Sequence, residues 1–233
     1  MADTCEQTLQ KPTGLQDLSI PHMRSHPSVL TSAAQAHAHP FSGLADLIDN
    51  SRESGAKLMS IDVVRRDEQR PLISLTDDGC GMDECSLTRL LSMGYTEKDR
   101  ETGQHYGMGT KTAIARLCSH ALIFSCAGAV RTVGLLSAKL FGDLKATEMF
   151  VPQCSWDSSD DVLQITSERA PLTHQQRLDS LQLILEHSPF KPAVDEEGAA
   201  LRALIGQFRH LPETGTRIIM WDVRKEVTAP SCI

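Results

Sequence analysis

The feature that most limits how this chain can fold is a pair of apolar runs separated by a two-residue link. Residues 120–127 and 130–137 are rich in apolar side chains, and Gly128-Ala129 lies between them. Two such runs joined by a short link that contains glycine are typical of an antiparallel β-hairpin. Since helical patterns come before and after this hairpin, the sequence predicts an α+β fold with helices and a sheet in two packed layers.

The remaining elements are predicted from the period of the apolar residues. Helices are expected over five segments: 41–54, 83–93, 110–117, 173–187 and 196–210. Strands are expected over four further segments: 58–64, 72–76, 148–151 and 216–223. Three segments without such a period are interpreted as an extended arm and two loops: 1–38, 94–109 and 154–161.

Composition argues against several classes of protein. The 23 basic and 30 acidic residues give a formal net charge of −7. This balance argues against a dedicated nucleic-acid domain with a basic face, although it leaves room for a local basic patch. No apolar run approaches the roughly 20 residues of a membrane span, and the polar residues 1–12 are unlike a signal peptide. The seven cysteines include no CxxC pair, so we expect reduced thiols in a cytoplasmic or nuclear protein.

The first polar motif lies in the helix expected over 41–54. Asp46 and Asn50 are four residues apart, so they share one face of that helix. The amide oxygen of Asn50 can ligate a hard cation such as Mg²⁺, and the carboxylate of Asp46 can orient or deprotonate a water molecule. An exposed polar helix face has the same pattern, so the pair alone leaves both interpretations open.

The second motif, Asp77-Asp78-Gly79-Cys80-Gly81-Met82, follows the strand expected over 72–76. An acid beside glycines at the end of a strand can accept a hydrogen bond from the edge of a nucleotide base, because glycine permits close backbone approach. An ordinary turn rich in Asp and Gly has the same composition. This motif by itself does not distinguish a base-binding turn from a structural one.

The third motif, Tyr-Gly-Met-Gly-Thr-Lys-Thr at residues 106–112, opens the helix expected over 110–117. Free amides at a helix N-terminus bind phosphate groups. In a P-loop a glycine directly precedes the lysine, whereas Thr110 here separates Gly109 from Lys111. The motif therefore predicts a phosphate site that is not a P-loop.

Taken in this order, the three motifs resemble the ATP-binding motifs of the GHKL superfamily, which comprises gyrase, a heat-shock chaperone, histidine kinases and the MutL mismatch-repair proteins. Five segments also resemble the microrchidia (MORC) branch of that superfamily: 39–50, 90–98, 133–137, 184–190 and 215–224. The similarity extends over roughly residues 25–226. It implies a two-layer α/β sandwich of the GHKL (Bergerat) type, followed by the start of a second α/β, S5-like transducer domain.

The resemblance also implies a domain organisation. We expect a flexible arm at 1–24, an ATP-binding domain at 25–152 and a partial transducer-like domain at 153–233. In the family the transducer carries a lysine that senses the terminal phosphate, and we expect it to lie beyond Ile233.

Individual residues acquire roles from the same resemblance. It places Asn50 at the magnesium-binding position, Asp77 at the position that reads the adenine amino group, and Asp46 at the position of the general base. The other residues that it implies in nucleotide binding are Gly79, Gly81, Met82, Met93, Gly94, Tyr95, Gly103, Tyr106, Gly107, Met108, Gly109, Thr110 and Lys111.

Two residues depart from the family's pattern. The family has Glu where this chain has Asp46, and the aspartate side chain is shorter by one methylene group. A displacement of about 1 Å in a catalytic group can cost on the order of a hundredfold in rate. Gly103 lies one residue further from Tyr106 than the pattern expects.

Two classes of function follow from the resemblance. In the first, the chain is an ATPase that uses ATP and Mg²⁺, forms an ATP-dependent homodimer and contributes to chromatin compaction and gene silencing in the nucleus. Chromatin or DNA would then be contacted through the full-length protein, and no membrane is involved. In the second, favoured by Asp46 and by the expected truncation of the transducer, the chain is a nucleotide-binding module with little or no hydrolysis. A chaperone or mismatch-repair relative is less favoured, because the segments after residue 180 resemble the MORC branch.

Overall fold

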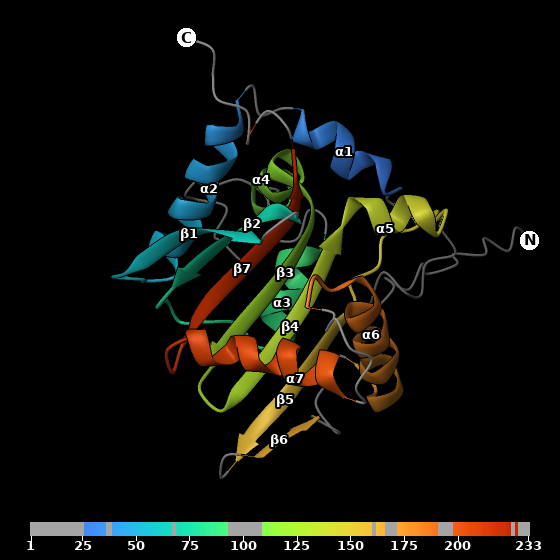
Figure 1. Ribbon diagram of the computed structural model, residues 1–233. Helices are drawn as coiled ribbons and strands as arrows, with labels where there is room; N and C mark the ends of the chain where they lie inside the picture. The colour runs from blue at the N-terminus through green and yellow to red at the C-terminus, as the bar shows by residue number, and fades with distance from the viewer. Residues whose placement is uncertain are drawn as a thin grey trace, which may run out of the picture.

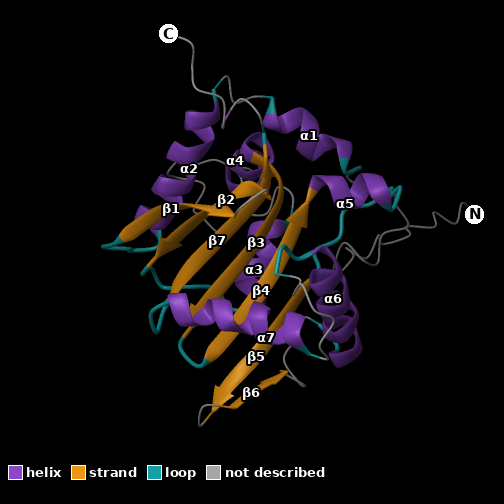
Figure 2. Cartoon of the chain, in the orientation of Figure 1, coloured by secondary structure: helices purple, strands orange, loops and turns teal. Residues whose placement is uncertain are grey.

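A computed structural model of the chain describes residues 26–35, 39–66, 69–92, 109–159, 162–165, 172–190, 198–224 and 227. In this part of the chain, helices pack on one sheet of seven antiparallel strands (Figures 1 and 2). The helices are α1 (Ser28–Ala34), α2 (Pro40–Glu53), α3 (Glu84–Leu91), α4 (Gly109–Leu117), α5 (Ala138–Asp143), α6 (His174–His187), α7 (Ala199–Ile205) and the 3₁₀ helix η2 (Gly206–His210). The strands are β1 (Met59–Arg66), β2 (Gln69–Asp77), β3 (Cys118–Ala127), β4 (Val130–Ser137), β5 (Gln153–Ser159), β6 (Val162–Ile165) and β7 (Gly215–Val223).

The last strand of the chain lies in the interior of the sheet. The strand order is β1-β2-β7-β3-β4-β5-β6, and Figure 1 shows β7 in red between β2 and β3. Thr216 of β7 lies opposite Asp77 of β2 on one side and opposite Ser125 of β3 on the other. The sheet therefore runs across the domain boundary predicted at residue 152, and the range 153–233 supplies two of its interior strands, β5 and β7, and the edge strand β6.

Helices α1, α2, α3 and α4 cover one face of the sheet. Their buried apolar residues and those of the strands beneath form one core, which includes Leu30, Leu47, Leu75, Leu87, Ile114, Ile123 and Met220. Helix α2 begins after His39, whose ring accepts a hydrogen bond from the Phe41 amide, and Pro40 fits its first turn because no N–H is needed there. Gly43 lets α2 approach α4, since a Cβ atom on Gly43 would lie only 3.2 Å from both Cα and the carbonyl oxygen of Ala113.

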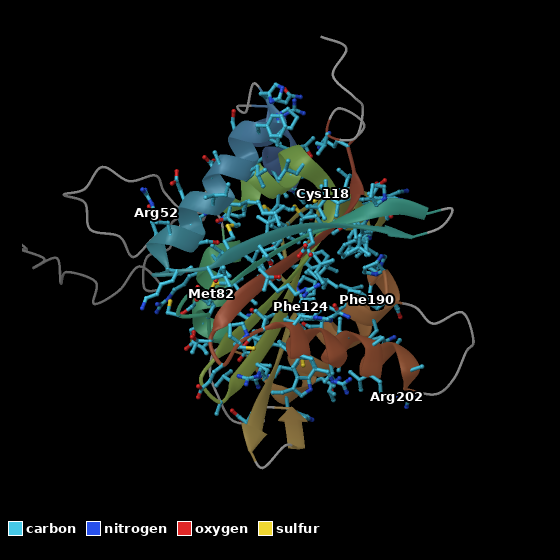
Figure 3. All side chains as sticks on the ribbon, turned by 60° about the vertical axis from the view of Figure 1, so that its left-hand side comes forward. Arg52, Met82, Cys118, Phe124, Phe190 and Arg202 are labelled. Carbon is cyan, nitrogen blue, oxygen red and sulfur yellow. The ribbon has the colours of Figure 1, made fainter. Side chains whose placement is uncertain are left out.

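The opposite face is covered by α6, α7 and η2. A second apolar core forms there, with Phe124, Trp156, Leu181, Ile184, Leu204 and Phe208 among its members. Phe124 and Phe208 meet edge to face, with ring centroids 5.4 Å apart. Figure 3 shows Phe124 inside the molecule, near α7. The sheet thus has a helical layer on both of its faces.

The α+β class is confirmed, and every helix and strand predicted between residues 41 and 137 is present. The strand predicted over 148–151 is wrong, because the strand begins only at Gln153, and the loop predicted over 154–161 is wrong as far as residue 159, because β5 occupies Gln153–Ser159. Cys154 and Trp156 are buried on the side of α6 and alternate with Ser155 and Asp157, so the segment has the period of a strand despite its polar composition. The extended arm predicted over 1–38 is wrong at Ser28–Ala34, which form α1, and neither α5 nor β6 was predicted. The flexible arm predicted over 1–24 lies outside the described residues. Within the ranges given above, no helix is long and apolar enough to cross a membrane.

Candidate functional site

The first motif residues lie where α2 meets the start of α4. The Asn50 side-chain amide donates a hydrogen bond of 2.9 Å to the Thr110 hydroxyl. Asp46, one turn earlier on α2, reaches the same place, since its Oδ2 atom lies 3.7 Å from where a Cβ atom on Gly109 would stand. Both predicted residues therefore lie beside the N-terminus of α4. Because Asn50 donates through Nδ2, its Oδ1 atom keeps the acceptor character that a hard cation requires.

The carboxylate of Asp77 is held by donors from three elements. Its Oδ1 atom accepts hydrogen bonds from the backbone N–H of Gly79 at 3.0 Å and of Thr216 at 3.2 Å. Its Oδ2 atom accepts one from the Ser51 hydroxyl of α2 at 2.8 Å. An ionised carboxylate has about four lone-pair sites, so these three donors leave Oδ2 with capacity for one more. The side chain is thereby fixed in orientation and can still accept a hydrogen bond from a ligand.

The glycines after Asp77 are required by close packing. A Cβ atom on Gly79 would lie 2.0 Å from the Ser54 hydroxyl oxygen, and one on Gly81 would lie 1.8 Å from the carbonyl oxygen of Cys126. Gly81 also has a positive φ of 70°, a conformation that glycine adopts at little cost. The turn therefore packs tightly between the C-terminal end of α2 and the end of β3.

Two further polar contacts fix this turn. The backbone N–H of Met82 donates to the Ser125 hydroxyl at 2.7 Å. Asp78, the second acid of the motif, accepts hydrogen bonds from the backbone N–H of Lys57 at 2.7 Å and of Leu58 at 2.8 Å. The bonds from Leu58 and then Lys57 are the main reason why the pKa of Asp78 lies below its ordinary value. Asp78 thus stabilises the entry to β1, whereas Asp77 faces the site.

Lys111 makes a contact that the sequence did not suggest. Its side chain is fully buried, and Nζ donates a hydrogen bond to the Leu90 carbonyl oxygen in the last turn of α3. Burial lowers the pKa of Lys111 to about 8, because desolvation disfavours the charged form. The contact with a phosphate implied for Lys111 stays a prediction.

Several predicted residues lie outside the described ranges: Met93, Gly94, Tyr95, Gly103, Tyr106, Gly107 and Met108. Three residues that the sequence analysis missed take part in the site: Ser51, Ser125 and Thr216. Ser51 directly follows Asn50, and its place in the first motif could have suggested it. Ser125 and Thr216 lie in strands without a local signal and are recognisable only from the pairing of β3 with β7.

Comparison with known proteins agrees with this geometry. Residues 38–150, which include every described residue of the three motifs, match the family of histidine kinase-, DNA gyrase B- and HSP90-like ATPases. The site and the fold thus define a GHKL-type ATPase domain, and the family supports the binding of ATP.

The similarity to curated proteins is to one branch of this superfamily. Protein MICRORCHIDIA 1 of Arabidopsis thaliana is 30% identical over 217 residues, which cover 88% of this chain and 32% of that protein. MORC family CW-type zinc finger protein 3 of Mus musculus is 31% identical over 221 residues, which cover 92% of this chain and 21% of that protein. The chain belongs to the MORC family of GHKL ATPases. It spans about a third or less of the length of these two relatives.

Proposed function

We propose that the chain binds Mg²⁺-ATP, with the adenine base at Asp77 and the phosphates at the junction of α2 and α4. The observation that carries this proposal is the Asp77 carboxylate, which three donors hold in place with one acceptor position left. The adenine amino group can supply the missing donor. The turn at Gly79 and Gly81 packs tightly on Ser54 and Cys126, so the course of the backbone beside Asp77 is fixed.

Asn50 and Asp46 support the other end of the proposed nucleotide. The Asn50 Oδ1 atom is a suitable ligand for magnesium, which is usually held by one or two protein oxygens together with phosphate oxygens. The bound cation would supply charge neutralisation at the phosphates. Asp46 would orient a water molecule beside the terminal phosphate and take its proton. Its side chain is one methylene group shorter than glutamate, so we propose that hydrolysis is slow.

A second candidate is a module that binds ATP without turnover. Asp46 favours this candidate, since a general base must come within about 3 Å of the proton that it takes, or act through one water molecule. We further propose that ATP binding drives two copies together and that the full-length protein acts in the nucleus, in chromatin compaction and gene silencing. The resemblance to the MORC family supports these last steps, and light scattering with and without a non-hydrolysable ATP analogue tests the dimer.

Calorimetric titration with ATP and ADP tests the binding site. Asp77→Asn should weaken both nucleotides alike by about 1–3 kcal/mol, because the amide replaces one acceptor oxygen by a donor and leaves polar groups of this half-buried site badly paired. Asp179→Asn is the matched control, since it removes a carboxylate from the exposed side of α6, where Asp179 contacts Gln175. A melting curve of each ligand-free variant separates loss of the fold from loss of the site. Equal affinity in Asp77→Asn and the native chain would show that the base does not bind at Asp77.

A further inference from the structure

Helix α3 joins two parts of the proposed site. Met82, which the second motif contributes, lies just before it, and Lys111 of the third motif contacts its last turn. The helix has only eight residues, and isolated helices of that length are unstable in water. Its position must therefore be set by the contacts that it makes.

One of these contacts is a buried ion pair with α6. Arg177 is fully buried and Glu84 is 4% exposed. Nε of Arg177 donates to Oε1 of Glu84 at 2.8 Å, and Nη2 donates to Oε2. The Ser155 hydroxyl of β5 donates to the same Oε1 atom at 2.8 Å. The first residue of α3 is thus fixed by two elements, α6 and β5, that both lie outside the matched ATPase range of 38–150.

The other end of α3 leads to the residues proposed to hold magnesium. The Leu90 carbonyl oxygen accepts the hydrogen bond of Lys111. Thr110, the neighbour of Lys111 on α4, accepts the hydrogen bond of Asn50. A displacement of α3 would therefore move the acceptor of Lys111, and with it the first turn of α4 beside Asn50.

A row of polar residues crosses the sheet between this ion pair and Asp77. Five residues lie opposite one another on five adjacent strands: Asp77, Thr216, Ser125, Thr132 and Ser155. Asp77 stands at one end of this row, and Ser155 at the other end donates to Glu84. The Ser125 hydroxyl in the middle accepts from the Met82 amide, which precedes α3. The bond from Met82 to Ser125 thus ties the entry of α3 to the strands beside Asp77, whereas the Thr132 hydroxyl, between Ser125 and Ser155 in the row, has no hydrogen-bond partner among the described residues.

Stability alone does not explain a buried ion pair at this place. Replacing such a pair by apolar side chains of similar volume is often neutral or stabilising, because two charges no longer have to be desolvated. The pair instead fixes the orientation of α3 relative to α6, since the planar guanidinium and the carboxylate form two parallel hydrogen bonds.

We infer that Arg177 is a positioning residue for nucleotide binding: through Glu84 it fixes α3, and through the Leu90 carbonyl oxygen it fixes the first turn of α4. This inference rests on the proposed Mg²⁺-ATP site. It assigns the segment after residue 150 a direct influence on nucleotide affinity, because α6 holds a helix of the site from outside the matched domain.

The test compares the native chain with Glu84→Gln/Arg177→Met, Arg177→Lys and Gln175→Ala. The double variant removes both charges together and leaves an amide oxygen at position 84 that can accept from Ser155, and its melting curve without ligand checks that the fold is preserved. Arg177→Lys keeps the charge but loses the fork. Gln175→Ala is the matched control on the exposed side of α6, where Gln175 contacts Asp179. Each protein is measured by melting without ligand, by calorimetry with Mg²⁺-ATP and by hydrogen exchange without ligand.

We expect the double variant to melt close to the native chain and to bind Mg²⁺-ATP about 2-fold to 30-fold more weakly, the range seen for residues that act on a site through others. The Mg²⁺-ATP affinity of Arg177→Lys should lie between those of the native chain and the double variant. The affinity of Gln175→Ala should equal that of the native chain. Amide exchange should rise in α3 and in residues 109–112, but not in β3 and β4. Native affinity and native exchange in the double variant would overturn the inference, as would an equal loss in Gln175→Ala. If the native chain itself binds no ATP, the proposed function fails, and the exchange of residues 109–112 still decides whether Arg177 positions α4.

Discussion

The two faces of the sheet are held to their helices by different kinds of contact. On the side of α6, α7 and η2, aromatic and aliphatic side chains such as Phe124, Trp156 and Phe208 pack together. The side of α1, α2, α3 and α4 has an apolar core too, but at the Asp77 end hydrogen bonds from Ser51 and Thr216 join the elements. Apolar packing is non-directional, whereas hydrogen bonds require defined distances and angles. Apart from the ion pair of Arg177 on α6 with Glu84, the first side therefore contributes mainly stability, and the Asp77 end contributes mainly geometry.

The largest effect that this comparison predicts is on stability, at Phe124. The side chain is fully buried and packs edge to face on Phe208. Phe124→Ala should lower the free energy of unfolding by about 3–5 kcal/mol, because it removes apolar contacts and leaves a cavity. Denaturant unfolding measures this loss. Under conditions where both proteins are folded, ATP affinity should be nearly native, and a parallel loss of affinity would show that the two faces are not separable.

On the other face of the sheet, Asn50→Ala should reduce ATP affinity and leave stability nearly unchanged. Asn50 is exposed, and its described contact is the hydrogen bond to Thr110, so the melting temperature without ligand should be nearly native. Calorimetry should show ATP affinity at the level that the native chain has without magnesium, because the amide oxygen that ligates the cation is gone. A large loss of stability without ligand would instead assign Asn50 a packing role.

The parts of the site that the sequence predicted are those set by local spacing. Asp46 and Asn50 share a helix face because they are four residues apart, and Gly81 lies in a turn that its neighbours define. The contacts of Asp77 with Thr216 and of Glu84 with Arg177 join residues 139 and 93 positions apart, and no local pattern encodes them. They depend on the insertion of β7 between β2 and β3 and on the place of α6 beside β5. Strand β5 was missed for another reason, since its polar residues obscured the alternation of Cys154 and Trp156.

A smaller effect is expected from Asp46→Glu. Asp46 lies beside the start of α4, where the terminal phosphate is proposed, but its carboxylate should fall short by about one bond. A catalytic group misplaced by about 1 Å can cost up to roughly a hundredfold, so restoring the length should raise the single-turnover rate on the order of tenfold. Binding should change little, because the base acts mainly in the transition state. Brisk hydrolysis by the native chain with a slower Asp46→Glu variant would show that the backbone already compensates for the shorter side chain.

The smallest effect concerns Lys111 of α4, a buried cation that changes its charge within an accessible pH range. Burial lowers the pKa of Lys111 from 10.5 to about 8, so in the folded chain the ammonium loses its proton at a lower pH than in the unfolded chain. Between pH 8 and pH 10.5 the unfolded state binds more protons, and the contribution of Lys111 to stability therefore rises with pH. Below pH 8 both states are protonated, and the cost of burying the charge is fully present.

Lys111→Met removes this titration while keeping an apolar stem of similar length. The melting temperature of the native chain should therefore rise relative to that of Lys111→Met between pH 7.5 and pH 9, by the equivalent of about 1 kcal/mol. A constant difference over this range would mean that the hydrogen bond to Leu90 compensates for burial. The burial of the Lys111 side chain would then have no net cost in stability.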